Sequence, residues 1–532
     1  MCGIWCVLGR QATHTEAEHA CHALHERGPE GSSVLDLPHA TLGFTRLAIN
    51  GLTPNGMQPM THKNISWIAN GEIYNWKELE QRLHLTHTSE SDCSILGALW
   101  TLHRFNPTAF FRALDGVFAL ILVDEETGIT TVGRDPYGIR PLFYVQVDEV
   151  FWFSSEMKGL KEVGGHHTIH AVKPGTYMQI NTQAGGEPLV TPYHTVPWIK
   201  NPALTDPGAA ARALKDGLQA AVRKRLLTER PVAALLSGGL DSSLVAALVQ
   251  RELKEAGKPP LETYTIGFEG STDLRFARLV ADHIGSKHTE IVMTPQEFFD
   301  AIPEVIRDIE SYDITTVRAS MGTWLVSREI RRRSDAKVLF NGDGSDEVFG
   351  SYLYFFGAPD DEQFEAETTR LLENIHKYDV LRSDRSISSH GLEPRTPFLD
   401  KQFVALARSI PTHLIRPVKG QQPEKWLLRK AFEGGLLPEA VLYRQKEAFS
   451  DGVSGTKPWY KEIQERVDLM DRPLRIYTHL PPPSAEAQYY RDIFDSFYGD
   501  EGSHIISYFW MPKWTTAKDP SATTLSFYTA QC

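Results

Sequence analysis

The chain has 532 residues, of which 41% are hydrophobic and 23% charged, a composition typical of soluble globular proteins with two or three domains. The sequence contains no apolar run long enough to predict a membrane span, and a net charge of −12 without a basic stripe argues against nucleic acid as a partner. Its five irregularly spaced cysteines form neither a disulfide framework nor a zinc pattern, and residues 1–6 do not read as a signal peptide, so we expect a cytoplasmic protein.

Short apolar runs broken by Gly, Pro and Asn predict antiparallel strands at residues 41–49, 117–124, 129–134, 142–147 and 176–180. A polar, proline-bearing stretch follows these runs. We therefore expect an N-terminal domain over residues 1–195, a linker over 196–206 and a C-terminal domain over 207–532.

The cysteine at position 2 is a candidate nucleophile. Removal of Met1 would leave Cys2 with a free α-amine. The ordinary pKa of such an amine, about 8, lies close to the thiol value of about 8.5, so the amine can accept the thiol proton near neutral pH. One residue would then supply both nucleophile and general base.

Polar groups suited to amide hydrolysis follow Cys2. Such a reaction needs donors for the oxyanion and partners for the α-carboxylate and α-ammonium of the substrate. The Asn70 side chain and the Gly71 N–H could stabilise the oxyanion. Arg46 could pair with the carboxylate, and Glu72 and Asp92 could hold the ammonium. Taken singly, these residues are better explained structurally, Arg46 as a surface ion-pair partner and Asn70-Gly71 as a hairpin turn, but in this order behind Cys2 they favour glutamine hydrolysis.

These motifs resemble those of the class II, N-terminal-nucleophile glutamine amidotransferases. The shared segments are Met-Cys-Gly-Ile, Arg-Gly-Pro, Arg-Leu-Ala-Ile, Asn-Gly-Glu-Ile-Tyr-Asn and Ser-Asp. The resemblance implies an αββα domain with antiparallel sheets (Ntn-hydrolase-like). It also implies that glutamine is contacted, partly through main chain, by Arg46, Leu47, Ala48, Ile49 and Asn50.

Beyond the linker, the pattern changes to alternating strands and helices. After a helix at residues 207–228, we expect strands at 231–236, 263–268, 288–293 and 337–340, separated by helical stretches at 243–256, 273–284 and 295–333. This alternation predicts a parallel sheet with helices on its faces. Beyond Gly350 the pattern is mostly helical.

A glycine-rich segment, Leu-Leu-Ser-Gly-Gly-Leu-Asp-Ser-Ser, fills residues 235–243 between the first of these strands and its helix. Glycines let a backbone approach phosphates, and the start of the helix attracts anions. The lysine of the GxxxxGK[ST] loop is missing. The segment resembles the pyrophosphate loop of the N-type ATP pyrophosphatases, Ser-Gly-Gly-x-Asp-Ser, which cleave ATP to AMP and pyrophosphate.

An acidic segment at residues 341–347 follows the last predicted strand. Both loops should emerge at the carboxyl edge of the sheet, where ligands bind in such folds. Asp241 and Asp346 are suited to hold Mg²⁺, which prefers carboxylates, water and phosphate oxygens. The spacing does not fit a calcium-binding EF-hand loop.

An ATP site of this kind also requires positive charge, because ATP, pyrophosphate and a substrate carboxylate bring negative charge together at one site. The candidates are Arg318, Lys425 and Arg429. Lys425 and Arg429 are four residues apart, which predicts that they share a helix face.

Most of residues 205–455 resemble the asparagine synthetases. The matching strings include Tyr-Thr-Ile-Gly at 264–267, Ser-Asp-Glu-Val-Phe-Gly at 345–350 and Glu-Pro-Arg-Thr-Pro-Phe-Leu-Asp at 393–400. The resemblance implies an adenine nucleotide α-hydrolase-like domain that converts ATP, aspartate, glutamine and water to AMP, diphosphate, asparagine and glutamate. The reaction would pass through β-aspartyl-AMP, with ammonia moving between the two sites through a tunnel.

The same resemblance assigns residues to this second site. Lys425 would stabilise charge during adenylation or ammonia attack, and Thr316, Arg318 and Arg429 would contact aspartate or the intermediate. A homodimer is one assembly compatible with the resemblance. ATP would be contacted by Leu235, Ser237, Gly238, Gly239, Asp241, Ser242, Ile266, Asn341 and Gly342.

One departure concerns the chemistry. Asparagine synthetases typically read Ser-Gly-Glu-Gly-Ser-Asp where this chain reads Asn341-Gly-Asp343-Gly-Ser-Asp. The family's glutamate supports formation of the intermediate, and Asp343 would have to take this role with a shorter side chain. A misplacement of about 1 Å can cost on the order of 100-fold in rate.

Four alternatives stay open on the sequence. The first is a related amidotransferase that activates another carboxylic acid, supported by Asp343 alone. The second is a pyrophosphatase-type tRNA-modifying enzyme, which would not explain Cys2. The third is a pseudoenzyme, against which the complete set of candidate residues argues. The fourth is a sugar-phosphate aminotransferring synthase, which would lack the Ser-Gly-Gly-Leu-Asp-Ser-Ser segment.

Overall fold

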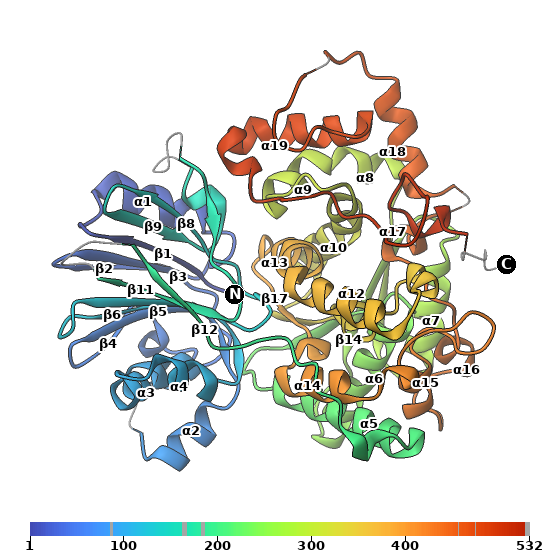
Figure 1. The fold of residues 1–532 in the computed structure, drawn as a ribbon, viewed down its shortest axis with the longest axis horizontal. Helices are drawn as coiled ribbons and strands as arrows, with labels where there is room; N and C mark the ends of the chain where they lie inside the picture. The colour runs from blue at the N-terminus through green and yellow to red at the C-terminus, as the bar shows by residue number, and fades with distance from the viewer. Residues whose placement is uncertain (86–88, 162–166, 182–186, 456, 474, 527–532) are drawn as a thin grey trace.

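The chain folds into two halves that lie side by side, with the N-terminus between them (Figure 1). The computed structural model describes residues 1–85, 89–161, 167–181, 187–455, 457–473 and 475–526. Strands dominate the first half and helices the second.

The first half contains two six-stranded antiparallel sheets. One sheet has the order β10 (His170–Ala171), β8 (Phe143–Val147), β9 (Val150–Ser154), β1 (Gly3–Leu8), β3 (Ala40–Thr45) and β2 (Ser32–Leu37). The other has the order β12 (Leu189–Pro192), β11 (Thr176–Asn181), β7 (Ile129–Arg134), β6 (Gly116–Asp124), β5 (Ile65–Ile73) and β4 (Met60–His62).

The two sheets pack face to face between helices, which confirms the αββα prediction. Strands of both sheets contribute side chains to one buried cluster, which includes Ile4, Leu42, Ile68 and Ile121. The helix α1 (His14–Ala23) covers one outer face, and α2 (Trp76–Leu83), α3 (Ile95–His103) and α4 (Pro107–Ala113) cover the other (Figure 1). Side chains along β1 therefore alternate: one set points into the space between the sheets, and the other set points to α1.

The predicted strands are present in the first half, but one ends earlier than the sequence indicated. The run predicted to continue to residue 49 leaves the sheet after Thr45. Arg46 forms an isolated bridge with Pro29 instead, and residues 46–50 run along the boundary between the halves. The apolar residues beyond Thr45 are buried against the second half, so their hydrophobicity reflects an interface and not a strand.

The second half contains a five-stranded parallel sheet in the order β15 (Lys287–Val292), β14 (Glu262–Gly267), β13 (Val232–Leu235), β16 (Val338–Phe340) and β17 (Glu393–Arg395). The first four strands were predicted. The fifth, β17, has three residues, one of them a proline, and its pairing with β16 arises only in the folded chain.

Helices connect and cover this sheet. The stretch predicted as helical at residues 295–333 is divided into α8 (Pro295–Asp300), α9 (Ile302–Ile309) and α10 (Ile314–Arg333). The second break falls where Glu310 has a left-handed backbone and Asp313 caps the start of α10. The other main helices are α5 (Pro207–Arg225), α6 (Leu240–Glu255), α7 (Thr272–Ile284), α11 (Ser345–Phe349), α12 (Asp361–Asn374), α13 (Asp379–Ser388), α14 (Lys401–Ser409), α15 (Trp426–Ala431), α18 (Trp459–Asp468) and α19 (Ala485–Ser503).

The segment between β12 and α5 packs onto the second half. The ammonium of Lys200 lies 2.6 Å from the Glu365 carboxylate, and the Asn201 N–H donates to the Ser409 carbonyl at 2.7 Å. The stretch expected to be a linker is therefore held in place along much of its length.

Buried ion pairs cross between the two halves. Arg27 contacts Asp384 at 2.9 Å, and Arg395 contacts Glu72 at 3.4 Å. Removing one partner from such a buried pair leaves an uncompensated charge, which costs about 3–5 kcal/mol. These contacts therefore fix the position of each half relative to the other.

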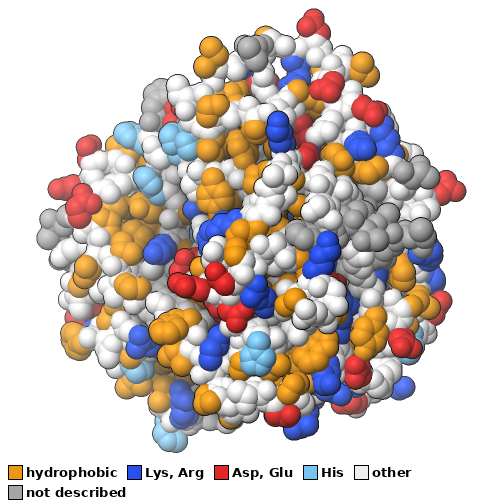
Figure 2. Space-filling model, turned by 45° about the vertical axis from the view of Figure 1, so that its right-hand side comes forward, with side chains coloured by type: hydrophobic (Ala, Val, Ile, Leu, Met, Phe, Trp, Pro, Cys, Tyr) orange, Lys and Arg blue, Asp and Glu red, His pale blue; other side chains and the backbone are white. Residues whose placement is uncertain are grey.

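Charges of both signs are spread over the face of the molecule shown in Figure 2, where Lys and Arg side chains alternate with Asp, Glu and hydrophobic groups. No continuous basic stripe crosses the described residues on that face. Among the described helices, none is both long enough and apolar enough to cross a membrane.

Candidate functional site

Cys2 lies directly before β1, at the boundary between the two halves. Its main-chain N–H donates to the Asn70 side-chain oxygen at 3.1 Å, and its thiol lies 3.6 Å from the Leu47 carbonyl. The Arg27 guanidinium donates to the Cys2 carbonyl at 3.1 Å. Burial raises the pKa of the Cys2 thiol above its ordinary value. A base at hand is therefore needed before this thiol can act as a nucleophile.

Met1 occupies a closed position beside Cys2. It is 1% exposed, and its ammonium lies 3.4 Å from the Glu393 carboxylate of the second half. Burial lowers the pKa of this ammonium. While Met1 is attached, the Cys2 nitrogen is an amide and cannot accept a proton, so the predicted base exists only after Met1 is removed.

Asn70 and Gly71 lie side by side in β5, next to Cys2. The Asn70 oxygen is engaged by the Cys2 N–H, while its Nδ2 is buried without a hydrogen-bond partner among the described residues. A side chain at Gly71 would place its Cβ 2.0 Å from the Val117 carbonyl oxygen, so only glycine fits there. A buried, unpaired amide donor beside a thiol is the arrangement that an oxyanion requires.

The residues predicted to hold the α-groups of glutamine lie around this pair. The Arg46 guanidinium donates to the carbonyls of Thr53 at 2.9 Å and Gly51 at 2.5 Å. These two bonds fix the orientation of the guanidinium and leave its other N–H groups to a ligand.

The two carboxylates differ in their surroundings. Glu72 accepts from the Asn50 side chain at 2.7 Å, and burial raises its pKa well above the ordinary value. Asp92 accepts from the Ile73 N–H at 2.6 Å, and burial raises its pKa to about 6. Because Glu72 is already paired with Arg395 at 3.4 Å, while Asp92 has no ion pair among the described residues, Asp92 is the better candidate for an ammonium group.

The main chain of residues 46–50 is held from both halves. The Ala48 N–H donates to Glu30 at 2.8 Å, and its carbonyl accepts from Arg230 at 2.8 Å. The Ile49 carbonyl accepts from the Glu229 N–H at 3.1 Å. The second half therefore helps to build the candidate glutamine site, and no sequence pattern predicted this contribution.

A second site lies at the carboxyl edge of the parallel sheet, as predicted. The loop after β13 and the loop after β16 meet there, because a Cβ at Gly342 would lie 2.7 Å from the Ser242 N. The hydroxyls of Ser237 and Ser242 lie 3.0 Å apart at the start of α6. The predicted ATP residues that line this pocket are Leu235, Ser237, Gly239, Asp241, Ser242, Ile266, Asn341 and Gly342.

Gly238 is the exception among the predicted ATP residues. It does not line the pocket, and its backbone lies against α7, where a Cβ would be 2.5 Å from the Ala277 N. Its glycine thus allows the loop to pack closely on a neighbouring helix.

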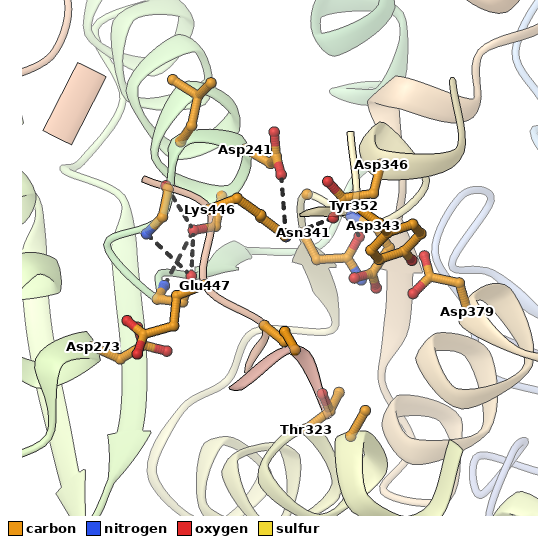
Figure 3. A pocket seen from close by; sticks show the side chains of 18 of the residues that line it. Asp241, Asp273, Thr323, Asn341, Asp343, Asp346, Tyr352, Asp379, Lys446 and Glu447 are labelled. Atoms are coloured by element: carbon orange, nitrogen blue, oxygen red, sulfur yellow. Dashed lines mark hydrogen bonds and ion pairs between the residues drawn. The ribbon is translucent and has the colours of Figure 1, made fainter. Parts of the chain in front are cut away.

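Two lysines join the two predicted metal-binding carboxylates. Lys425 lies 2.6 Å from Asp241 and 2.7 Å from Asp346, and Lys446 lies 2.5 Å from the other oxygen of Asp346. These lysines keep the pKa of the Asp346 carboxyl far below its ordinary value, although burial opposes this. Figure 3 shows Lys446, Asp241 and Asp346 facing the same cavity.

The donor set fits Mg²⁺ only in the presence of a substrate. Within the described ranges, no cluster of three or more His, Cys, Asp or Glu side chains could hold a metal ion on its own. Asp241 and Asp346 supply two carboxylates, and Mg²⁺ in nucleotide sites is commonly held by one or two carboxylates together with phosphates and water.

Two predicted contacts differ from expectation. Arg318 lines the pocket, but its guanidinium is paired with Glu486 at 2.6 Å and Asp519 at 2.8 Å. Thr316 does not line the pocket, because its hydroxyl donates to Asp313 at 2.9 Å. The neighbouring Thr315 does line it, and its hydroxyl is buried without a partner among the described residues.

Lys425 and Arg429 do not share a helix face. Lys425 precedes α15 and has a left-handed backbone with φ of 56°, which turns its side chain toward Asp241 and Asp346. Arg429 lies inside α15, and its guanidinium bonds to the Glu424 side chain and the Leu442 carbonyl. The spacing of four residues assumed a continuous helix, which begins only at Trp426.

Several pocket residues received no role from the sequence. Lys446, Arg382, Asp379 and Tyr352 all line the cavity. Lys446 and Arg382 lie in segments that match the asparagine synthetases, and a search for cations in those segments would have found them. Nothing local marks the others, because their position depends on how α11 and α13 pack beside the sheet.

Comparisons with known proteins agree with the two-site arrangement. The family described as the glutamine amidotransferase domain matches residues 1–203. The family described as asparagine synthase matches residues 213–365 and 357–516. Over 562 aligned residues, the chain is 39% identical to "Asparagine synthetase [glutamine-hydrolyzing]" of Homo sapiens, and the alignment covers 99% of each chain. The protein of the same description from Gallus gallus is also 39% identical, with the same coverage.

Proposed function

The chain belongs to the glutamine-hydrolysing asparagine synthetases, and from that premise we propose how its residues divide the reaction between two sites. The enzyme is a carbon–nitrogen ligase that makes asparagine, with glutamine as the nitrogen donor and ATP as the second substrate. We assign glutamine hydrolysis to a domain over residues 1–195 and the ATP-dependent steps to a domain over residues 207–532. Residues 196–206 join the two domains.

In the first domain, Cys2 attacks the side-chain amide of glutamine after Met1 has been removed. The free α-amine takes the thiol proton and returns it to the departing ammonia, and water then releases glutamate from the thioester. Asn70 Nδ2, which is buried and has no hydrogen-bond partner in the part of the chain that the structure describes, donates to the oxyanion together with the Gly71 N–H. Arg46 binds the α-carboxylate of glutamine, and Asp92 binds its α-ammonium.

In the second domain, the β-carboxylate of aspartate attacks the α-phosphorus of ATP and displaces pyrophosphate. Ammonia then attacks the carbonyl carbon of β-aspartyl-AMP, and AMP leaves. Lys425 and Lys446 neutralise the phosphate charge that develops in both steps. The observation that supports this assignment best is the meeting of Asp241, Asp346 and both lysines beside the loop of residues 237–242.

We assign Mg²⁺ to Asp241 and Asp346, where it would neutralise phosphate charge. Ammonia would pass from Cys2 to the second site inside the protein, because protonation in water would remove its nucleophilicity. A cytoplasmic location and a homodimer are parts of the same proposal.

The test of this function is pyrophosphate release by the purified protein with ATP, Mg²⁺ and glutamine, comparing aspartate with a panel of other carboxylic acids. We expect release to depend on aspartate and asparagine to appear in equal amount. Release that depends on a different acid would favour the related-amidotransferase alternative, for which Asp343 is the specific observation.

The pH dependence of glutamine hydrolysis should report Asp92. Because its pKa is raised to about 6, the carboxyl is ionised above pH 6 and neutral below, where it no longer attracts an ammonium group. Protonation of the Cys2 α-amine also lowers activity at acid pH, so below pH 6 we expect kcat/KM for glutamine to fall about tenfold per pH unit more steeply than this amine alone would cause. In Asp92→Asn, activity should be low and the limb shallower by this one proton, since the amide does not titrate and its oxygen can still accept the Ile73 N–H. An unchanged limb in that variant would remove Asp92 from this role.

A further inference from the structure

Lys446 belongs to a segment that crosses the second site, which we call the crossing segment (residues 444–453). The Lys446 ammonium lies 2.5 Å from Asp346, and Figure 3 shows this side chain directed across the cavity. Its main-chain N–H donates to the Glu424 side chain at 2.9 Å. Residues 444–448 form no helix or strand, so contacts with their surroundings must fix the course of the chain.

Arg444 joins the start of the crossing segment to two other parts of the site. Its Nη1 donates to the Ser237 carbonyl, in the loop after β13, at 3.4 Å. Its Nη2 donates to Asp273 at 3.0 Å and to Glu447 at 2.6 Å. Asp273 lies in the first turn of α7, and Glu447 lies in the crossing segment itself. One guanidinium group therefore connects the loop, the helix and the segment.

The Arg444 side chain is enclosed by these neighbours. It is 6% exposed, and its guanidinium lies over the Phe276 ring, 4.3 Å from the ring centroid. Phe276 packs in turn on the loop after β13, because a Cβ at Gly238 would lie 2.5 Å from the Phe276 Cβ. A planar guanidinium can stack on a ring and donate hydrogen bonds in its own plane at the same time. The ring therefore fixes the plane in which Arg444 donates.

Two carboxylates share this one cation. Asp273 and Glu447 accept from the same nitrogen of Arg444 and lie side by side in Figure 3. Asp273 is 3% exposed, so little water screens its charge from that of its neighbour. Without the guanidinium, the two like charges would repel each other. Glu447 would then move away from α7, and Lys446, the preceding residue, would move with it.

We propose that Arg444 is a positioning residue for Lys446. By joining the carboxylates of Asp273 and Glu447, it fixes the crossing segment beside the loop after β13, and so holds the Lys446 ammonium where phosphate charge develops. The proposal rests on the proposed function, which gives Lys446 its role in adenylation. Arg444 acts through the position of Lys446, so its effect should disappear when the Lys446 ammonium is absent.

The first test is Arg444→Met, measured by aspartate-dependent exchange of pyrophosphate into ATP. We expect kcat to fall about 10- to 100-fold, because a displacement of about 1 Å costs on that order, with KM for ATP within about threefold of the wild-type value. Arg444→Lys keeps a cation between the two carboxylates and should recover most of the loss. A rise in KM for ATP at unchanged kcat would show that Arg444 binds the nucleotide itself, which would overturn the proposal.

A matched control packs on the same aromatic ring. Arg275 is exposed and lies over Phe276 at 4.9 Å from the ring centroid, but it does not line the cavity formed by the described residues. Arg275→Met removes an arginine from this ring without touching the crossing segment, and should exchange at the wild-type rate. Glutamine hydrolysis at Cys2 and the thermal unfolding midpoint establish that each variant is folded.

The position of the crossing segment can also be followed without catalysis. A lysine-specific endoproteinase cleaves a chain that has opened locally, so cleavage after Lys446 reports release of the segment. We expect this cleavage to be at least about tenfold faster in Arg444→Met than in the wild type or Arg275→Met. Cleavage after Lys461, in α18, should keep its wild-type rate. An unchanged rate after Lys446 would overturn the proposal.

The decisive comparison combines Arg444→Met with Lys446→Met. If Arg444 acts through Lys446, its replacement should lower exchange less than about threefold in the Lys446→Met background, against about 10- to 100-fold in the wild-type background. Equal losses in both backgrounds would overturn this inference alone. Absence of aspartate-dependent exchange in the wild type would overturn the proposed function, and this inference with it.

Discussion

Replacing Cys2 by alanine should abolish asparagine synthesis from glutamine and leave synthesis from ammonium intact. The variant lacks the nucleophile, so glutamine hydrolysis should fall at least about 1,000-fold. The second site keeps Asp241, Asp346 and both lysines, so it should still form the acyl adenylate and accept ammonia supplied from solution. The measurement is asparagine formation with either nitrogen source.

Cys6 offers the matched control for this experiment. It lies in β1, which begins directly after Cys2, is 1% exposed, and among the described residues its thiol hydrogen-bonds only to the Val7 carbonyl at 3.5 Å. Cys6→Ala should keep glutamine-dependent synthesis, apart from a modest loss of stability from the small cavity. Glutamine-dependent synthesis that survives in Cys2→Ala would show that another group attacks the amide.

Replacing Lys425 by methionine should have the largest effect on the second site. Lys425 is the only side chain that lies within 3 Å of both Asp241 and Asp346 among the described residues, and it is 3% exposed. Removing it takes away a preorganised positive charge where phosphate charge develops, so aspartate-dependent pyrophosphate exchange should fall about 100- to 1,000-fold. Methionine keeps most of the length of the side chain and so separates loss of charge from loss of packing.

Lys430→Met is the control for Lys425→Met, because it removes a lysine charge from the same helix region but outside the site. Lys430 lies in α15 a few residues further on, is exposed, and rests over the Trp426 ring at 5.5 Å. Lys430→Met should exchange pyrophosphate at the wild-type rate. Glutamine hydrolysis without ATP should persist in Lys425→Met, because Cys2 and Asn70 belong to the other site. If both lysine variants kept full exchange, Lys446 alone would have to carry the charge.

The sequence predicted the elements whose cause is local. Short apolar runs punctuated by turn residues predicted strands such as β6 and β7, and the glycine-rich segment after β13 was predicted to lead into a helix, which in the structure begins at Leu240. The strand β17 was missed because three residues carry no periodicity, and the break at Glu310 was missed because a left-handed glutamate has no sequence signature.

The candidate site residues follow the same pattern: the sequence predicted those that a local motif positions, and missed contacts that depend on residues far along the chain. Residues within motifs, such as Asn70 and Asp346, lie at the predicted sites. Arg318 was expected to meet substrate, but Glu486 and Asp519, far along the chain, surround its guanidinium. A partner 201 residues away in sequence leaves no mark near the arginine itself. Lys425 reaches its carboxylates through a backbone conformation that spacing does not encode.

The closed position of Met1 limits how the protein can be produced. Its nitrogen is buried beside Glu393, and its sulfur lies 3.8 Å from the Arg27 guanidinium. An affinity tag or fusion partner attached ahead of Met1 would have to continue from this buried nitrogen. Its peptide chain would then have to pass through the interface between the two halves. Unless a protease cut directly before the cysteine, such a product would lack the terminal amine and would separate surfaces that pack together in the native protein.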